Sequence, residues 1–592
     1  MSRTRFVIHR LAWIAPGLVI GLVWIWRASW VVGGERRYTL FDDALISLSY
    51  ARTLADTGEL VWFPGADRVE GITNPLWTLY MSLIHLLGFS ESQIILVVSV
   101  TGLLTVLASA LIAGRLALRI TPSAKWVEPA SVLVVSLSFP ALFWSIRGME
   151  VGLQLLLASS LLLLIARSIS QLAISASTLT FIVVITALGV WTRLDFLVIV
   201  LALAAWLLVS TRKRDPGWLL ALTLVLAGAA AFVVQAAWRW AYYGYLLPNT
   251  YYLKVEGHDL IDRILRGQWT DGKLPLLIAV LVLSALVFGS FKNRRDDSFL
   301  IAGMLLTVSV ALVAYSTYVG GDAWDELTVP NRYVVPAFAF GAVLFLTATA
   351  MMLSRGVRWY FIVGPLLAGG LFVVLGLRAL LRGSIQLDDS IPGVAVVALL
   401  VATGIAVLIA TYWILLWKAG LSRSGESKET AVRIVAVTLS VLLSGSLSWV
   451  SVAMNGGPKV DADQRYAEYG LVLRESLLPG TSVAVTFAGA PVYFSGLTSI
   501  DLLGKNDPVI ARMQPVLGFK PGHDKFDYEY SIGVLRPDVI MQLFVASAED
   551  YAYIEGLGYR YCGLNPSDQL PALGVWIQED ANVLRSGVSC SP

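Results

Sequence analysis

Two adjacent aspartates near the N-terminus, Asp42 and Asp43, stand at the start of a predicted amphipathic helix. The helix is predicted because Ala44, Leu48 and Ala51 recur at spacings of four and three residues. A carboxylate at such a position can accept the proton of an attacking hydroxyl, and a second can bind hydroxyls or a divalent ion. The structural alternative is that Asp42 caps the helix and Asp43 is a first-turn acid favoured by the helix dipole.

A second helix is predicted to begin at Thr73, Asn74 and Pro75, because proline suits the first helical position and Thr or Asn suits the cap. The sequence FPGADRVEG between the two helices is typical of a turn. This turn is expected to carry Arg68 and Glu70 back toward the surface on which the aspartates lie.

The composition places these residues in a membrane protein. The chain is 57% hydrophobic and 14% charged, whereas soluble domains contain about 25% charged residues. A formal net charge of +3 is too small for this length to indicate a nucleic-acid partner. The two cysteines, Cys562 and Cys590, and four scattered histidines provide neither a zinc site nor a disulfide framework, although one bridge is open to them.

The apolar segments predict an α-helical polytopic protein with about thirteen membrane spans. The first, 11–26, follows the basic residues 1–10, and we expect it to stay uncleaved because Trp26 and Arg27 replace a small-residue cleavage site. The basic end is expected in the cytoplasm, as are the later Lys- and Arg-rich connections. The other spans are predicted near 92–117, 129–145, 149–166, 174–191, 194–211, 217–242, 273–291, 297–318, 333–353, 359–379, 392–417 and 431–453.

This threading places Asp42 and Asp43 outside the cell, together with five connections rich in charged and aromatic residues. For any one of these connections, the alternative is that it is polar simply because it meets water. Taken together, they indicate the rim of one extracytoplasmic cavity. The spans contain almost no charged residues, which disfavours an ion-coupled transporter. The five connections are 145–152, 191–196, 239–259, 318–333 and 378–390.

Residues 456–592 change character, and the membrane domain is predicted to comprise 1–455. Short β-like runs at 482–487, 539–542 and 574–577 alternate with helical runs at 461–478 and 547–557, which predicts an extracytoplasmic α/β domain. Outside the cytoplasm, we expect Cys562 and Cys590 to form a disulfide. Two segments of this domain, SIDLLGKNDPVIARM (499–513) and PGHDKFDYEY (521–530), stand out; the alternative is that each is a polar loop closing onto the membrane domain.

Several motifs in order carry a resemblance that covers nearly the whole chain: FDDALISLSYAR, RVEGITNPLW, SIRGMEVGL, TRLD, YYGYLLPNTYYLK, VGGD with NRYVVP, and IDLLGKNDPVIAR. They resemble the GT-C membrane glycosyltransferases that use polyprenyl-phosphate-linked sugars, and most closely the actinobacterial terminal arabinofuranosyltransferases (the AftB-like group). The resemblance implies that an acid of the first outer loop is catalytic, which maps to Asp42 or Asp43. It also implies that the donor enters laterally from the outer leaflet.

The predicted function is transfer of a sugar, arabinofuranose by resemblance, from a polyprenyl-phosphate donor to a cell-envelope glycan at the extracytoplasmic face of the plasma membrane. Asp42 is assigned as the group that accepts the acceptor's proton. Asp43 is assigned to sugar hydroxyls or to a divalent cation (Mg²⁺, Mn²⁺ or Ca²⁺), and no cofactor is otherwise expected. If the reaction retains configuration, the acid attacks the sugar directly.

The leaving lipid phosphate requires positive charge and hydrogen-bond donors at the membrane surface. For each Arg or Lys the alternative is interfacial anchoring, and for Asp195 it is a salt bridge to Arg193. On the acceptor side we place His523 and Asp524. The candidate donor-binding residues are Arg52, Arg68, Glu70, Thr73, Asn74, Glu150, Arg193, Asp195, Arg239, Asn249, Lys254, Asp322 and Arg332.

Two other functions are compatible with such a chain. A non-enzymatic transporter or flippase of polyprenyl lipids would use the same outer loops to bind a headgroup without transferring a sugar. A phosphoethanolamine-type transferase is the weaker candidate, because its zinc-binding acids and histidines are absent from this sequence.

Overall fold

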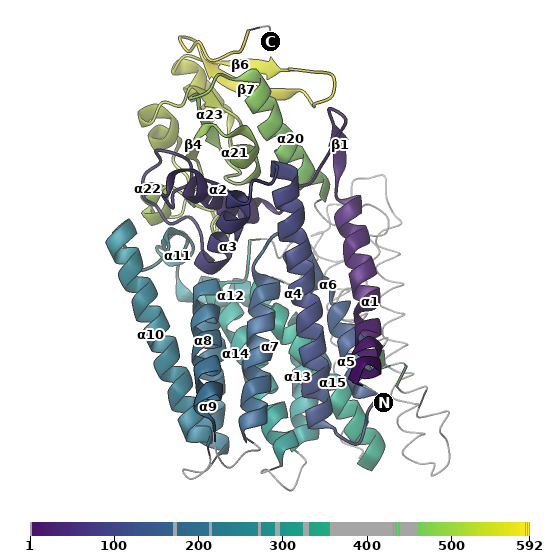
Figure 1. The fold of residues 1–592 in the computed structure, drawn as a ribbon. Coiled ribbons are helices and arrows are strands. Elements are labelled where there is room, and N and C mark those ends of the chain that lie inside the picture. The colour runs from purple at the N-terminus through teal and green to yellow at the C-terminus, as the bar shows by residue number, and fades with distance from the viewer. Residues whose placement is uncertain are drawn as a thin grey trace, which may run out of the picture.

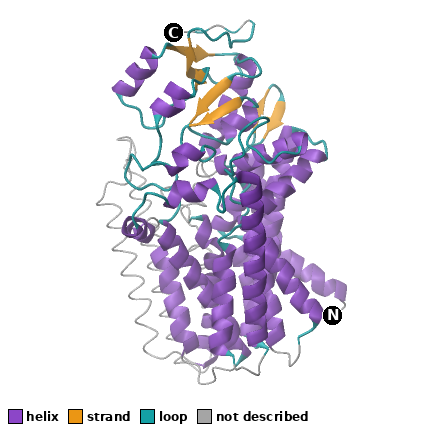
Figure 2. Ribbon diagram, turned by 90° about the vertical axis from the view of Figure 1, so that its left-hand side faces the viewer, coloured by secondary structure: helices purple, strands orange, loops and turns teal. Residues whose placement is uncertain are grey.

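The computed structural model describes residues 3–169, 174–211, 216–269, 274–289, 296–323, 331–355 and 460–586, with single residues at 430, 433, 434, 436, 437, 588 and 590. Within these residues a long helical bundle carries a smaller α/β domain on one end (Figures 1 and 2). The spans predicted at 359–379, 392–417 and 431–453, the connection 378–390 and the domain boundary at 455/456 lie outside the described residues, apart from 433, 434, 436 and 437.

The bundle is built from apolar helices. Four helices, α4, α7, α10 and α14, are each long and apolar enough to cross a membrane, as is the continuous segment Arg332–Ser354. The described part of the chain is therefore that of a multi-pass membrane protein, as predicted. The bundle helices are α1 (Arg3–Arg27), α4 (Glu91–Ile120), α5 (Val127–Ser136), α6 (Phe139–Ile146), α7 (Val151–Ile169), α8 (Ala176–Thr192), α9 (Phe196–Ser210), α10 (Gly217–Tyr243), α13 (Leu274–Gly289), α14 (Asp297–Val319) and α15 (Val335–Arg355), the last preceded by the 3₁₀ turn η2 (Arg332–Val334).

The span predicted at 129–145 is broken rather than straight. Helices α5 and α6 meet at an angle of 44°, and Pro140 occupies the first turn of α6. Proline lacks a backbone N–H and restricts the residue before it, so one helix cannot continue smoothly through this point. The end of α6 also lies against α4, because a Cβ built on Gly102 would come within 2.0 Å of the Ser145 carbonyl oxygen. This close approach fixes the loop that carries Arg147 and Glu150.

The segment after α1 forms a hairpin that the sequence analysis did not predict, with β1 (Trp30–Val32) antiparallel to β2 (Glu35–Arg37). Gly33 and Gly34 both have positive φ, as a two-residue hairpin turn requires. The two predicted amphipathic helices follow as α2 (Asp42–Thr57) and α3 (Pro75–Leu86). The face of α2 that contains Ala44, Leu48 and Ala51 is fully buried, as its periodicity predicted.

Between the bundle and the α/β domain lie α2, α3 and α11 (Asn249–Val255) (Figure 1). The short α12 (Leu260–Trp269) follows α11 and packs against α14. Residues from the first 90 and from the middle of the chain therefore meet at one end of the bundle. This arrangement places the side chains of the predicted site under the C-terminal domain.

The C-terminal domain has a five-stranded mixed sheet in the order β4-β3-β5-β7-β6. Strand β3 pairs in parallel with β4 and β5, whereas β7 is antiparallel to β5 and β6. The predicted α/β class is confirmed, but β4 and β6 were not predicted. The elements are α20 (Val460–Ser476), β3 (Ser482–Val485), α21 (Ala490–Ser495), β4 (Thr498–Asp501), α22 (Pro508–Arg512), the π-helical turn η3 (Glu529–Val534), β5 (Val539–Ile540), α23 (Ala548–Gly556), β6 (Tyr559–Leu564) and β7 (Leu573–Gln578).

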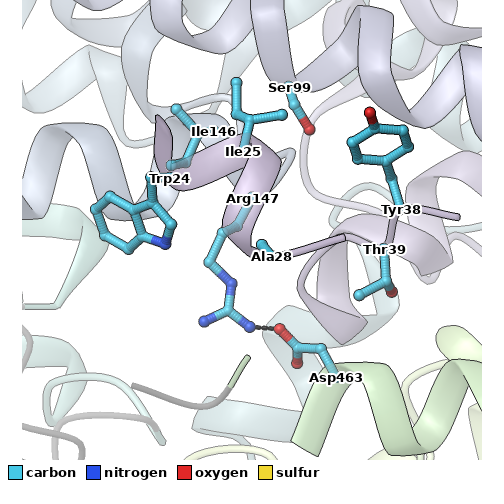
Figure 3. A pocket seen from close by; sticks show the side chains of 9 residues that line it. All are labelled: Trp24, Ile25, Ala28, Tyr38, Thr39, Ser99, Ile146, Arg147 and Asp463. Carbon is cyan, nitrogen blue, oxygen red and sulfur yellow. Dashed lines mark ion pairs between the residues drawn. The ribbon is translucent and has the colours of Figure 1, made fainter. Parts of the chain in front are cut away.

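The domain is fixed to the bundle by polar contacts as well as by packing. Arg147, after α6, forms a buried ion pair with Asp463 of α20, in the wall of a small cavity beside α1 (Figure 3). Trp62 Nε1 donates a hydrogen bond to the carbonyl oxygen of Ala488 at 3.1 Å. A disulfide joins Cys562 of β6 to Cys590 and ties the C-terminal segment to the sheet.

Candidate active site at the domain interface

The start of α2 is fixed by the residue that precedes it. Phe41 occupies the N-cap position, its side chain is buried, and its ring packs edge-on against Trp144. Its backbone N–H donates to the carbonyl oxygen of Arg147 at 3.0 Å. Asp42 and Asp43 are therefore the first two residues of the helix, and neither side chain is needed as a cap.

Asp42 points into the interface with the C-terminal domain. Its Oδ1 accepts hydrogen bonds from the backbone N–H groups of Ala490 at 2.8 Å and Gly489 at 3.2 Å. Among the described residues, Oδ2 has no hydrogen-bond partner. Burial raises the pKa of the Asp42 carboxyl to about 6, although Lys505 and the Ala490 amide act in the opposite direction. One oxygen thus orients the group and the other is available for a proton.

Asp43 has the opposite environment. Its Oδ1 lies 2.6 Å from the Lys505 ammonium and its Oδ2 lies 2.9 Å from Arg332 Nη2. Burial disfavours ionisation, but Lys505 and Arg332 outweigh it and lower the pKa of the Asp43 carboxyl. Arg332 also pairs through Nε with Asp322 at 2.8 Å. Asp43 is therefore a permanent anion between two cations.

A third cation belongs to the same group. Lys254 of α11 lowers the pKa values of both Asp43 and Asp322. A Cβ built on Gly522 would lie 3.5 Å from the Lys254 Cε, which places Lys254 beside His523. Burial and the nearby Lys505 lower the pKa of the His523 imidazole to about 3.

We name Lys254, Arg332 and Lys505 the cation cluster. Its three positive charges face the carboxylates of Asp43 and Asp322, and Lys505 also faces Asp42. The charges are therefore balanced when Asp42 is ionised, and one positive charge is in excess when Asp42 is protonated. These charges come from α11, from the turn before α15 and from the C-terminal domain. Three cations gathered in a largely buried site provide the donors and the positive charge that an anionic ligand requires.

A buried network lies behind the aspartates. Arg193 Nη1 binds Glu150 at 2.5 Å, and the same guanidinium makes a bidentate contact with Asp195 at 2.7 and 3.0 Å. The Asn74 side-chain amide donates to Glu150 at 2.7 Å, so Asn74 occupies the N-cap position of α3 but does not use its side chain as a cap. Asp195 thus adopts the salt bridge given as its structural alternative. The charges and hydrogen-bonding groups of this network pair with one another, so the network is a rigid structural support behind the aspartates.

A second ion pair joins the loop before α3 to α10. Arg239 Nε lies 2.6 Å from Glu70 Oε2, and both side chains are buried. The Glu70 carbonyl accepts from the backbone N–H of Asn249. The Asn249 side chain then donates to the carbonyl oxygens of Gly504, Lys505 and Asp507 at 2.9, 3.1 and 3.1 Å. The loop that carries Lys505 is therefore held by the membrane domain.

Three predicted site residues, Arg52, Arg68 and Asp524, lie away from this centre. Arg52 donates to the Tyr493 carbonyl and stacks on its ring. Arg68 is exposed beside Glu59 and Tyr242. Thr73 is half-buried. The Asp524 carboxylate accepts from the Lys520 backbone N–H and lies 3.4 Å from His258, so it orders its own loop.

Lys505 was not predicted as a site residue from the sequence, although the segment that contains it, 499–513, stood out there. The available signal was a lysine between Gly504 and Asn506 directly after a strand. Asp501, which ends that strand, accepts from the backbone N–H groups of Leu503, Gly504 and Asn506, and Gly504 has φ +77. An Asp that binds the backbone following it in this way forms an Asx-type turn, which holds the loop in one conformation. Within the described residues no three His, Cys, Asp or Glu side chains gather as a metal site, and a divalent cation remains a prediction.

The bundle, the carboxylate-bearing helix at its end and the α/β domain above it define the class: the chain has the fold of the GT-C glycosyltransferases. ArnT from Cupriavidus metallidurans is similar over 97% of this chain and 98% of its own, with 12% identity and a TM-score of 0.50. The structure of the same protein bound to undecaprenyl phosphate is similar over 98% of this chain and 99% of its own, with 12% identity and a TM-score of 0.51. The oligosaccharyltransferase AglB from Archaeoglobus fulgidus, in complex with an inhibitory peptide and a dolichol-phosphate, is also similar. The similarity covers 98% of this chain and 75% of AglB, with 11% identity and a TM-score of 0.50.

At such low identity the structural similarity shows the fold alone and does not single out the arabinofuranosyltransferase subgroup. Residues 458–575 match the model of a domain of unknown function, DUF8728. A comparison with curated protein sequences gives no match.

Proposed function

We propose that this protein is a membrane glycosyltransferase that moves a sugar from a polyprenyl-phosphate donor to a hydroxyl group of an acceptor. The observation that carries the proposal is the contrast between Asp42, which has a free oxygen and a raised pKa, and the neighbouring Asp43, held in the cation cluster. The GT-C fold supports it, as do structures of ArnT with undecaprenyl phosphate and of AglB with a dolichol-phosphate.

The chemistry assigned to Asp42 is general base catalysis. In direct displacement the acceptor oxygen forms a bond to the anomeric carbon, and the bond from that carbon to the phosphate oxygen breaks with its electron pair on the phosphate. The acceptor's proton passes to Asp42 Oδ2. A base works best when its pKa lies near the working pH, and the Asp42 carboxyl, with a pKa of about 6, meets this condition.

The cation cluster is assigned to the leaving phosphate. Charge builds up on that phosphate as the bond to the sugar breaks, and preorganised cations in a water-poor site stabilise it strongly. Asp43 holds Arg332 and Lys505 in place through both of its carboxylate oxygens. Under this assignment the two aspartates have separate tasks.

The finer assignment is arabinofuranose as the sugar, a cell-envelope glycan as the acceptor and the extracytoplasmic face as the location. It is supported by the order of motifs along the chain and by the basic connections expected in the cytoplasm. The buried carboxylate of Asp322 shares Arg332 with Asp43, so it lies where sugar hydroxyls would need an acceptor.

The test is incubation of the purified full-length protein with a panel of polyprenyl-phosphate sugars, followed by mass analysis of the released lipid phosphate and of the extended acceptor. Asp42→Asn retains an oxygen for the Ala490 amide and should bind donor while losing about a hundredfold to ten-thousandfold in transfer rate. The matched control is Asp56→Asn, an exposed position on the same helix, which should remain fully active. A wild-type protein that moves lipid across vesicles but never transfers sugar would instead identify the flippase.

A further inference from the structure

Lys505 brings a positive charge from the C-terminal domain into the site of the membrane domain. Its ammonium lies 2.6 Å from Asp43 Oδ1, across 462 positions of sequence, and the residue is only 9% exposed. Lys505 is therefore the member of the cation cluster that the C-terminal domain contributes.

The loop that presents Lys505 is fixed from both domains. Asp501 binds three of its backbone N–H groups, and Asn249 of the membrane domain binds three of its carbonyl oxygens. Tyr50 of α2 also donates to the side chain of Asn506 at 3.0 Å. A charged group held so firmly is preorganised for a ligand, because little side-chain or loop freedom remains to be lost on binding.

The ammonium has binding capacity that the protein does not use. A lysine has three N–H donors, and within the described residues the Lys505 ammonium makes one hydrogen bond, to Asp43. By contrast, the Arg332 guanidinium is engaged by two carboxylates, of Asp43 and Asp322. A nearly buried cation with two unused donors favours an anion with several acceptor oxygens.

We propose that Lys505 is a ligand of the donor's phosphate group through its unused donors, so that the C-terminal domain completes the binding site, and that phosphate and Asp43 compete for the positive charge of this one ammonium. The inference rests on the proposed function. When phosphate binds, part of the positive charge of Lys505 is neutralised by the ligand. Lys505 then stabilises the ionised form of Asp42 less, which makes Asp42 a stronger proton acceptor only when donor is present.

The competition has an unusual consequence for Asp43. Removing its negative charge should leave the cations free for the ligand, so Asp43→Asn should bind a lipid phosphate several-fold more tightly than the wild type does. A purely structural role for the Lys505–Asp43 pair gives the opposite result, because losing a partner would loosen the site. The two possibilities therefore predict opposite changes in the affinity of Asp43→Asn for a lipid phosphate.

The experiment measures binding of undecaprenyl phosphate to the purified full-length protein in detergent, with undecaprenol, which lacks the phosphate, as the reference ligand. Lys505→Met should weaken phosphate binding about tenfold or more and leave undecaprenol binding unchanged. Lys505→Arg should restore most of the affinity. Arg560→Gln removes one positive charge from an exposed strand of the same domain and should change neither.

The outcomes separate the two proposals. Wild-type protein that binds both lipids equally would overturn the proposed function, and with it this inference. Phosphate-selective wild-type binding together with unchanged affinity in Lys505→Met would overturn the inference alone. Weaker binding in Asp43→Asn would overturn the competition, and that variant keeps the test decisive if Lys505→Met does not fold.

Discussion

The carboxylates of Asp42 and Asp43 follow each other in the chain but belong to different environments. Asp42 accepts hydrogen bonds from the backbone of the C-terminal domain at Ala490, whereas Asp43 is held between Arg332 and Lys505. Burial affects both groups, yet the pKa of one is raised and that of the other is lowered, because only Asp43 has two cations in contact. When the environments of two neighbouring acids move their pKa values apart, one acid is suited to proton transfer and the other to stabilising charge.

The rate of sugar transfer should depend on the ionisation of Asp42. A base must be deprotonated to act, so kcat/KM should rise about tenfold per pH unit below pH 6 and level off above it. The measurement is a pH–rate profile of the wild type beside Asp42→Asn, whose residual rate should lack this limb. A flat wild-type profile between pH 5 and 7 would refute the assignment.

The pH dependence of the free energy of unfolding should also reflect the ionisation of Asp42. The folded-state pKa of Asp42, about 6, lies above the ordinary value of 3.8, so the folded protein binds this proton more tightly than the unfolded chain. Stability from this group is complete below about pH 4 and is lost as pH rises toward 6, by at most about 3 kcal/mol. Glu70, with a pKa raised to about 7, acts in the same direction. Thermal unfolding across this range should therefore vary less in Asp42→Asn than in the wild type.

Gly489→Ala should weaken docking of the C-terminal domain. A Cβ at this position would come within 1.9 Å of the Asp42 carbonyl oxygen, so α2 or the domain must shift, at a cost of about 1–3 kcal/mol. Gly556→Ala is the control, because a Cβ there meets nothing within 4 Å and a helical alanine is favourable. Limited proteolysis and thermal unfolding would check this. Equal protease resistance and equal unfolding temperatures of the two variants would contradict the close contact between Gly489 and Asp42.

Arg193→Met should be strongly destabilising. Arg193 is the shared partner of Glu150 and Asp195, all three buried, and its removal leaves two carboxylates uncompensated, which costs about 3–5 kcal/mol. Arg68→Met, at an exposed ion pair, should change the free energy of unfolding by less than about 1 kcal/mol. Thermal unfolding in detergent compares the two variants. A stable Arg193→Met would show that the network of Arg193, Glu150 and Asp195 is not a structural support.

The local pattern of the sequence was enough to predict most of the helices and the class of the fold. Apolar runs of span length need little context, since a membrane requires the backbone to satisfy its own hydrogen bonds. The amphipathic periodicity of α2 likewise identified its buried face. The break between α5 and α6 is a local effect of Pro140, but the strands β4 and β6 depend on pairing partners elsewhere in the sheet and carried a weaker signal.

The assignment of roles within the site was decided by tertiary structure. The sequence identified two aspartates and a set of basic residues, but a contact between Asp43 and Lys505 across 462 positions has no local signature. Nor does the sequence show that Asp42 meets the amide of Ala490, or that Asn74 turns from its helix to Glu150. A side chain's charge is fixed by its type, but its pKa and its partners depend on which distant groups the fold brings within a few ångströms.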